Sequence, residues 1–70
     1  MPEVETRLIR LPEVLRLTGL GKSQVYALAK AGKFPTPIKL SERCSAFEES
    51  EIRAWIAERI AERNAKAAAA

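Results

Sequence analysis

The side chains best suited to chemistry in this chain lie close together, between positions 22 and 30. Val25, Leu28 and Ala29 follow helical spacing there and predict one buried face, which leaves the opposite face polar. That face carries ammonium, hydroxyl, amide and methyl groups, from Lys22, Ser23, Gln24, Tyr26, Ala27 and Lys30. A glutamine amide pairs with an adenine edge, an alanine methyl meets a thymine methyl, and lysines suit phosphates or guanine. The predicted chemistry is recognition of double-stranded DNA.

Two further basic residues, Lys39 and Arg43, lie in a segment that predicts a small β-hairpin over 38–47. Ile38-Lys39-Leu40 alternates inward, outward, inward, as half-buried strands do. As a wing, the hairpin would place Lys39 and Arg43 along the DNA backbone or in the adjacent minor groove, whose negative potential attracts arginine. As a structural cap, it would cover the core with Ile38, Leu40 and Phe47. Both interpretations can hold, because alternate residues face opposite ways.

The sequence offers no set of residues that suits catalysis or metal binding. There is no histidine, so the usual general base and the commonest metal ligand are missing. Cys44 is the single cysteine, and we expect a small, partly buried residue that forms no disulfide within the chain. We therefore expect a protein that is not an enzyme and needs no cofactor or metal. The lone cysteine and the lack of an apolar run of ~20 residues favour a cytoplasmic protein that does not enter the membrane.

The polar face belongs to the second of two predicted helices. The first helix covers about residues 12–18, with Gly19 placed for a left-handed stop, and the second covers 22–31, with Gly21 as an acceptable N-cap. Two helices joined by a short glycine-containing turn predict a helix-turn-helix. The alternative is an αα-corner used only for packing. Tyr26 also has two interpretations, because its hydroxyl can reach a phosphate or its ring can fill the edge of the core.

A long amphipathic helix is predicted after the hairpin. Its apolar stripe consists of Ile52, Trp55, Ile56 and Ile60, with Trp55 as the expected central core residue. Its start has two interpretations, a capping box of Ser45 with Glu48 or a later start in which Glu48 caps and Glu51 reaches back. We prefer the later start, because the earlier one would consume the strand that ends at Phe47.

The remaining segments complete one small domain. Residues 7–10 suggest a short strand or an extended lead-in, with Leu8 or Ile9 on the core. We expect a disordered N-terminus over 1–6, the folded domain over 7–64, and a low-complexity tail over 65–70 that is either a frayed helix end or an added tail.

Basic residues are concentrated in the same part of the chain as the predicted helix-turn-helix. From Arg7 to Arg43 there are eight basic residues against two acidic residues, a net charge of +6, although the whole chain carries only +3. A basic segment of this kind is the electrostatic footprint of a phosphate-binding surface.

A longer pattern connects these elements. The run R-L-P-E-V-L-x-L-T-G-L-x-K-S-x-V-Y-x-L-x-K-A-G-K-F-P-x-P-I-K-L, continued by Arg43, Phe47 and S-E-I-x-A-W-I, resembles the AlpA family of prophage-encoded regulators over about residues 7–60. The resemblance implies a MerR-like or excisionase-like winged helix-turn-helix that binds DNA, with 22–31 as the recognition helix and 38–47 as the wing. The chain departs from the family pattern at Gly21, Ala27, Ser41-Glu42 and Phe47, where the family usually has serine, arginine, glycine and tryptophan.

We therefore expect a mainly α protein with a small β-hairpin, a winged helix-turn-helix, that reads a specific DNA sequence and regulates transcription of a prophage or other mobile element. An excisionase-like architectural protein, which bends DNA and recruits an integrase, would use the same fold. A third alternative is a protein-interaction module that docks through Ile52, Ile56 and Ile60. Because one reading face covers few base pairs, we expect a homodimer or a cooperative array on DNA.

Overall fold

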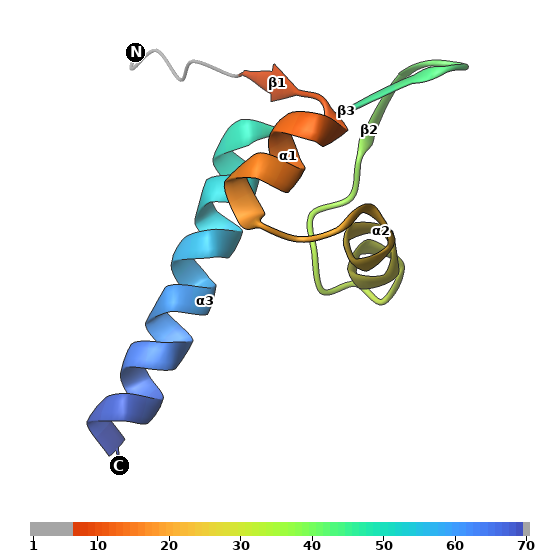
Figure 1. The fold of residues 1–70 in the computed structure, drawn as a ribbon. Coiled ribbons are helices and arrows are strands. Elements are labelled where there is room, and N and C mark those ends of the chain that lie inside the picture. Colours follow the sequence, from red (N-terminus) through yellow and green to blue (C-terminus); the bar gives the residue numbers. More distant parts are fainter. Residues whose placement is uncertain (1–6, 70) are drawn as a thin grey trace.

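The described part of the chain forms three helices and three short strands (Figure 1). The structure, a computed structural model, describes residues 7–69, so the predicted disorder of residues 1–6 lies outside the described residues. In chain order the elements are β1 (Leu8–Ile9), α1 (Leu11–Thr18), α2 (Lys22–Lys30), β2 (Ile38–Ser41), β3 (Cys44–Glu48) and α3 (Glu49–Ala69). None of these helices is long and apolar enough to cross a lipid bilayer.

The predicted helix-turn-helix is present, and its turn is built on Gly19. The hydroxyl of Thr18, the last residue of α1, donates to the carbonyl oxygen of Val14 at 2.8 Å and accepts from the N–H of Leu20 at 3.2 Å. Gly19 has a φ of 76°, and its N–H donates to the carbonyl oxygen of Leu15. Glycine adopts this left-handed conformation without the clash that a Cβ atom meets. The turn therefore depends on glycine at this position.

β3 is the central strand of the sheet. β1 and β2 both pair with it in an antiparallel manner, which gives the order β1-β3-β2. Ile9 lies opposite Phe47 and both are buried, whereas Leu8 lies opposite Glu48 and is exposed. Residues 7–10 therefore contain a strand, and Ile9 rather than Leu8 covers the core.

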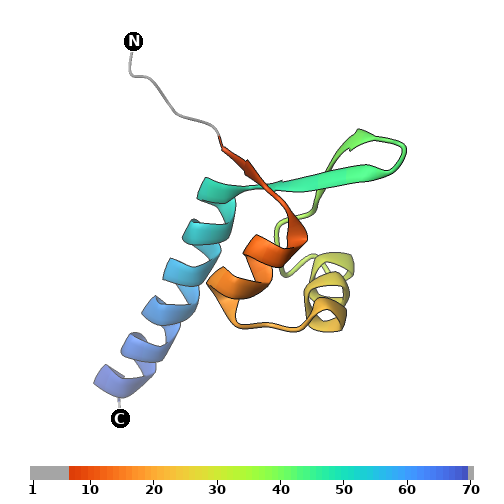
Figure 2. The same ribbon diagram turned by 45° about the horizontal axis from the view of Figure 1, so that its top comes forward.

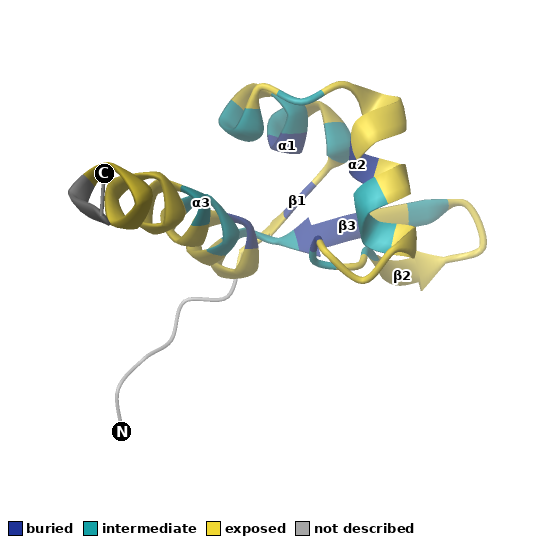
Figure 3. Ribbon diagram, turned by 90° about the horizontal axis from the view of Figure 1, so that it is seen from below, coloured by how far each residue is buried: buried dark blue, intermediate teal, exposed yellow. Residues whose placement is uncertain are grey.

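One small apolar core lies where the helices meet the sheet (Figure 3). It consists of Ile9, Val14, Val25, Phe34, Phe47 and Ile52. The prediction that Trp55 is the central core residue is wrong, because its indole is half-buried at the edge and packs against Phe34 with ring centroids 4.8 Å apart. The Nε1–H of Trp55 donates to the carbonyl oxygen of Lys33 at 2.7 Å. An indole N–H needs such a partner, and the rim of the core supplies one.

The prediction that Ile38 and Leu40 face the core is also wrong. Their exposed fractions are 40% and 49%. The β2–β3 hairpin extends past the helices (Figure 2), so β2 lies where no described element covers it. Phe47 is buried as predicted, because it belongs to the end of β3 that packs on α1 and α3.

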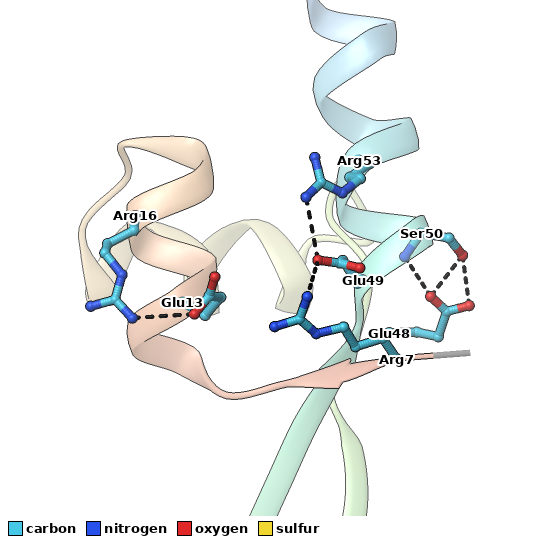
Figure 4. Close-up of polar contacts among 7 residues, drawn as sticks. All are labelled: Arg7, Glu13, Arg16, Glu48, Glu49, Ser50 and Arg53. Atoms are coloured by element: carbon cyan, nitrogen blue, oxygen red, sulfur yellow. Dashed lines mark hydrogen bonds and ion pairs between the residues drawn. The ribbon is translucent and has the colours of Figure 1, made fainter. Parts of the chain in front are cut away.

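α3 begins directly after Glu48, in agreement with the later of the two predicted starts. The Glu48 carboxylate accepts hydrogen bonds from the hydroxyl and the backbone N–H of Ser50 (Figure 4). The bond from the Ser50 hydroxyl, followed by the backbone bond, lowers the pKa of the Glu48 carboxyl below its ordinary value. α3 then continues without a break to Ala69.

We expect Gly19→Ala to lower the free energy of unfolding by about 1 kcal/mol, because alanine is strained at a positive φ. Apart from Gly19 itself and its two chain neighbours, no atom lies within 4 Å of the position that the Cβ would take, so overlap with the rest of the domain adds nothing to this loss. Gly21→Ser is the control, because Gly21 has a φ of −86° and serine is a better N-cap. Urea denaturation of both variants measures the difference. Equal losses would contradict the role assigned to the left-handed turn.

The lowered pKa of Glu48 predicts a pH-dependent contribution to stability. The ionised carboxylate caps α3, so its contribution is present above the ordinary pKa of 4.5 and is lost as the pH falls through the lowered value. Glu48→Gln should flatten the acid side of the plot of melting temperature against pH. Glu42→Gln, in the turn of the hairpin, is the control and should keep the slope of the parent protein.

Candidate nucleic-acid interface

α2 is anchored through one face and exposed on the other. Val25 is fully buried, and Leu28 and Ala29 are half-buried against the core. The six helix residues predicted to recognise DNA are all exposed: Lys22, Ser23, Gln24, Tyr26, Ala27 and Lys30. Figure 3 shows α2 at the opposite end of the domain from the C-terminal half of α3, with much of its surface exposed. The described chain therefore leaves this polar face uncovered.

The first turn of α2 uses a candidate base-reading side chain as part of its cap. Gly21 is the N-cap residue and has no side chain to offer, but its own N–H donates to the Oε1 of Gln24 at 2.9 Å. This bond is one half of a capping box. The Nε2 amino group of Gln24 makes no hydrogen bond within residues 7–69 and remains available as a donor. Gln24 thus has a structural role that the sequence analysis did not identify.

The hairpin carries the other two predicted site residues. Lys39 and Arg43 are both exposed, and Lys39 lies opposite Ser45 in the β2–β3 pairing. The pairing is irregular between Lys39 and Ser41, next to the turn. Figures 1 and 2 both show the hairpin on the same side of the domain as α2, away from the free end of α3. The hairpin therefore has the position of a wing.

A hollow lies between α2, the wing and the start of α1. Its volume is about 490 Å³, and its lining residues are Arg10, Leu11, Pro12, Tyr26, Arg43 and Ser45. Tyr26 is 46% exposed and does not belong to the core, which decides between its two predicted positions. Arg43 of the wing and Tyr26 of α2 face the same space although they are far apart in sequence.

The sequence analysis missed Arg10 and Ser45 as members of this surface. Arg10 is the N-cap residue of α1, and its side chain makes no capping bond. Its place before a predicted helix start was a usable signal. A cation there interacts unfavourably with the positive end of the helix dipole, which suggests that Arg10 has a role other than stabilising the helix. Ser45 has no such signal, because only the β2–β3 register places it opposite Lys39.

Charges on the rest of the domain are largely paired. The ion pairs among residues 7–69 are Arg7–Glu49, Arg53–Glu49, Arg16–Glu13, Arg59–Glu58 and Arg59–Glu62, with N–O distances of 2.7 to 3.9 Å. Figure 4 shows the first three of them. Within the same residues, six cations between positions 10 and 43 have no acidic partner: Arg10, Lys22, Lys30, Lys33, Lys39 and Arg43. Unpaired positive charge is thus concentrated on the helix-turn-helix and the wing.

An exposed second helix, an adjoining wing and a set of unpaired cations together define a winged helix-turn-helix of the DNA-binding class. The chain belongs to the AlpA family, because the family model described as "Prophage CP4-57 regulatory protein (AlpA)" matches residues 7–60. The resemblance inferred from the sequence motifs is therefore confirmed, and the family is one of prophage regulatory proteins.

One relative extends this comparison. The chain is similar to "Uncharacterized protein ORF88" of Enterobacteria phage P4, with 41% identity over 64 residues, which cover 90% of this chain and 73% of the phage protein. No solved structure matches the chain.

Proposed function

We propose that this protein is a sequence-specific DNA-binding regulator that controls transcription within a prophage or another mobile element. The observation that carries the proposal is the separation of charge: cations of α2 and the wing have no acidic partner among residues 7–69, whereas the ion pairs involve mainly α3. An exposed cationic face attracts the DNA polyanion from a distance and holds it by release of counterions. Membership of a prophage regulatory family supplies the biological setting.

In this proposal α2 enters the major groove and the wing follows the backbone or the adjacent minor groove. Base edges are read by Ser23, Gln24, Tyr26 and Ala27, through hydroxyl and amide groups and a methyl contact. Phosphates are held by Lys22, Lys30, Lys39 and Arg43. No catalytic step or cofactor is involved. The protein acts where the DNA is, in the cytoplasm, as a homodimer or a cooperative array, because one α2 spans only a few base pairs.

The proposal predicts a binding constant that falls steeply with salt. We expect Lys22→Gln and Lys30→Gln each to lower the slope of log K against log salt by about 0.9, because each removes one phosphate contact. The measurement is a titration of labelled DNA from upstream of the protein's own gene at several salt concentrations. Lys66→Gln is the matched control, because Lys66 is exposed in the last turn of α3, at the end of that helix that lies away from the wing (Figure 1). Equal effects of all three substitutions would contradict a localised interface.

The two roles of Gln24 can be separated by a pair of substitutions. Gln24→Ala removes both the cap acceptor and the amide, so we expect lower stability, by about 0.5 to 1 kcal/mol, and weaker binding to the preferred sequence. Gln24→Glu keeps an acceptor for the Gly21 N–H but loses the donor, so stability should hold while preference for the cognate sequence falls. Cognate and shuffled duplexes are compared for both variants. Unchanged preference in both would rule out base reading by Gln24.

A further inference from the structure

We propose that the hollow between the start of α1, α2 and the wing binds one phosphodiester of the DNA backbone. The inference rests on the proposed function and names the ligand of one part of its surface. It assigns Arg10, Tyr26, Arg43 and Ser45 to backbone contacts. For Tyr26 this contact replaces the base contact proposed above, and Arg43 binds a phosphate rather than entering the minor groove.

The two arginines of the hollow differ from every other arginine in the described chain. Arg7, Arg16, Arg53 and Arg59 contact carboxylates, and Arg63 donates to the side-chain oxygen of Asn64. Within residues 7–69, the side chains of Arg10 and Arg43 contact neither a carboxylate nor a side-chain amide oxygen. No carboxylate lines the hollow. Two guanidinium groups left in this way around one space favour an anionic ligand from outside the chain.

The other polar groups of the hollow suit the same ligand. Tyr26 and Ser45 both line the space, and their hydroxyls make no hydrogen bond within residues 7–69. Each is a neutral donor that complements the charged forks of Arg10 and Arg43, and phosphate oxygens accept from both kinds of group. The first turn of α1 adds the positive end of its dipole, although Pro12 has no N–H to donate.

The position of the hollow identifies which anion reaches it. A single sugar-phosphate strand separates the major groove of DNA from the neighbouring minor groove. If α2 lies in the major groove, that strand passes between α2 and the wing, where Tyr26 and Arg43 line the same hollow. The hollow is open rather than enclosed, so a continuous backbone can cross it.

Inorganic phosphate is the first probe. The ¹⁵N-labelled full chain is titrated with phosphate, with sodium chloride adjusted to keep the ionic strength constant. We expect the side-chain N–H signals of Arg10 and Arg43 and the amide of Ser45 to shift with saturation. Arg43→Gln should abolish these shifts, and Arg63→Gln, which removes the same charge from α3, should leave them. Unchanged signals of Arg10 and Arg43 across the titration would overturn the site.

Duplex binding is the second measurement. Upstream DNA and a shuffled duplex are compared for Arg10→Gln, Arg43→Gln, Tyr26→Phe and the control Arg63→Gln. We expect Arg10→Gln and Arg43→Gln each to weaken binding to both duplexes roughly tenfold, since each removes a charge-assisted hydrogen bond to phosphate. Tyr26→Phe should weaken both roughly threefold. The ratio between the two duplexes should stay constant in every case. All four substituted residues are exposed, and all except Tyr26 are charged, so the melting temperatures of the variants should match that of the parent protein.

The outcomes separate this inference from the function on which it rests. If the parent protein binds no duplex, the proposed function fails and the inference fails with it. If the parent protein binds with salt dependence and Lys22→Gln weakens binding, while Arg10→Gln and Arg43→Gln do not, the inference alone fails. A loss for Arg43→Gln that is confined to one duplex sequence would show base reading in the minor groove and would also overturn it.

Discussion

The packing of Val25 into the core is the interaction on which the rest of the structure depends. Val25 is fully buried in a core that also contains Val14 of α1, Phe47 of β3 and Ile52 of α3. That contact determines the rotation of α2 about its own axis, and the rotation decides which side chains remain outside. Because a chain of this length can build only one small core, the helix-turn-helix, the wing and α3 all depend on the same few side chains. The orientation of the polar face is therefore a consequence of packing.

The distribution of charge has a consequence that the net charge of +3 conceals. Three glutamates of α3, Glu49, Glu58 and Glu62, contact arginines of α3 or Arg7, while the cations of the helix-turn-helix and the wing face solvent. Exposed ion pairs add little to stability, typically ~0 to 1 kcal/mol each. Their larger effect here is to neutralise one side of the domain, so that the positive field arises from the other side. A modest overall charge can thus support a strongly directional surface.

The segment of α3 that matches the family model is also the segment that packs on the core. The match ends at residue 60, and burial decreases along the helix up to that point, from the fully buried Ile52 through the half-buried Ile56 to Ile60, which is 45% exposed. The matched segment therefore contains the parts that build the domain. The turns of α3 beyond it are stabilised by local features, chiefly an alanine-rich composition and the pair between Arg59 and Glu62.

The sequence by itself determined the helices, the turn between them and the strands of the wing. These features depend on local chemistry: the spacing of Val25, Leu28 and Ala29, the left-handed preference of Gly19, and the extended backbone that the prolines before Ile38 impose. Only the tertiary structure decided that Trp55 sits at the rim, that Ile38 and Leu40 face solvent, and that β1 joins the sheet. It alone brought Arg10 and Arg43 to one hollow beside Tyr26. The physical reason is that alternation and periodicity show which faces an element has, whereas burial and convergence depend on which distant element packs against each face.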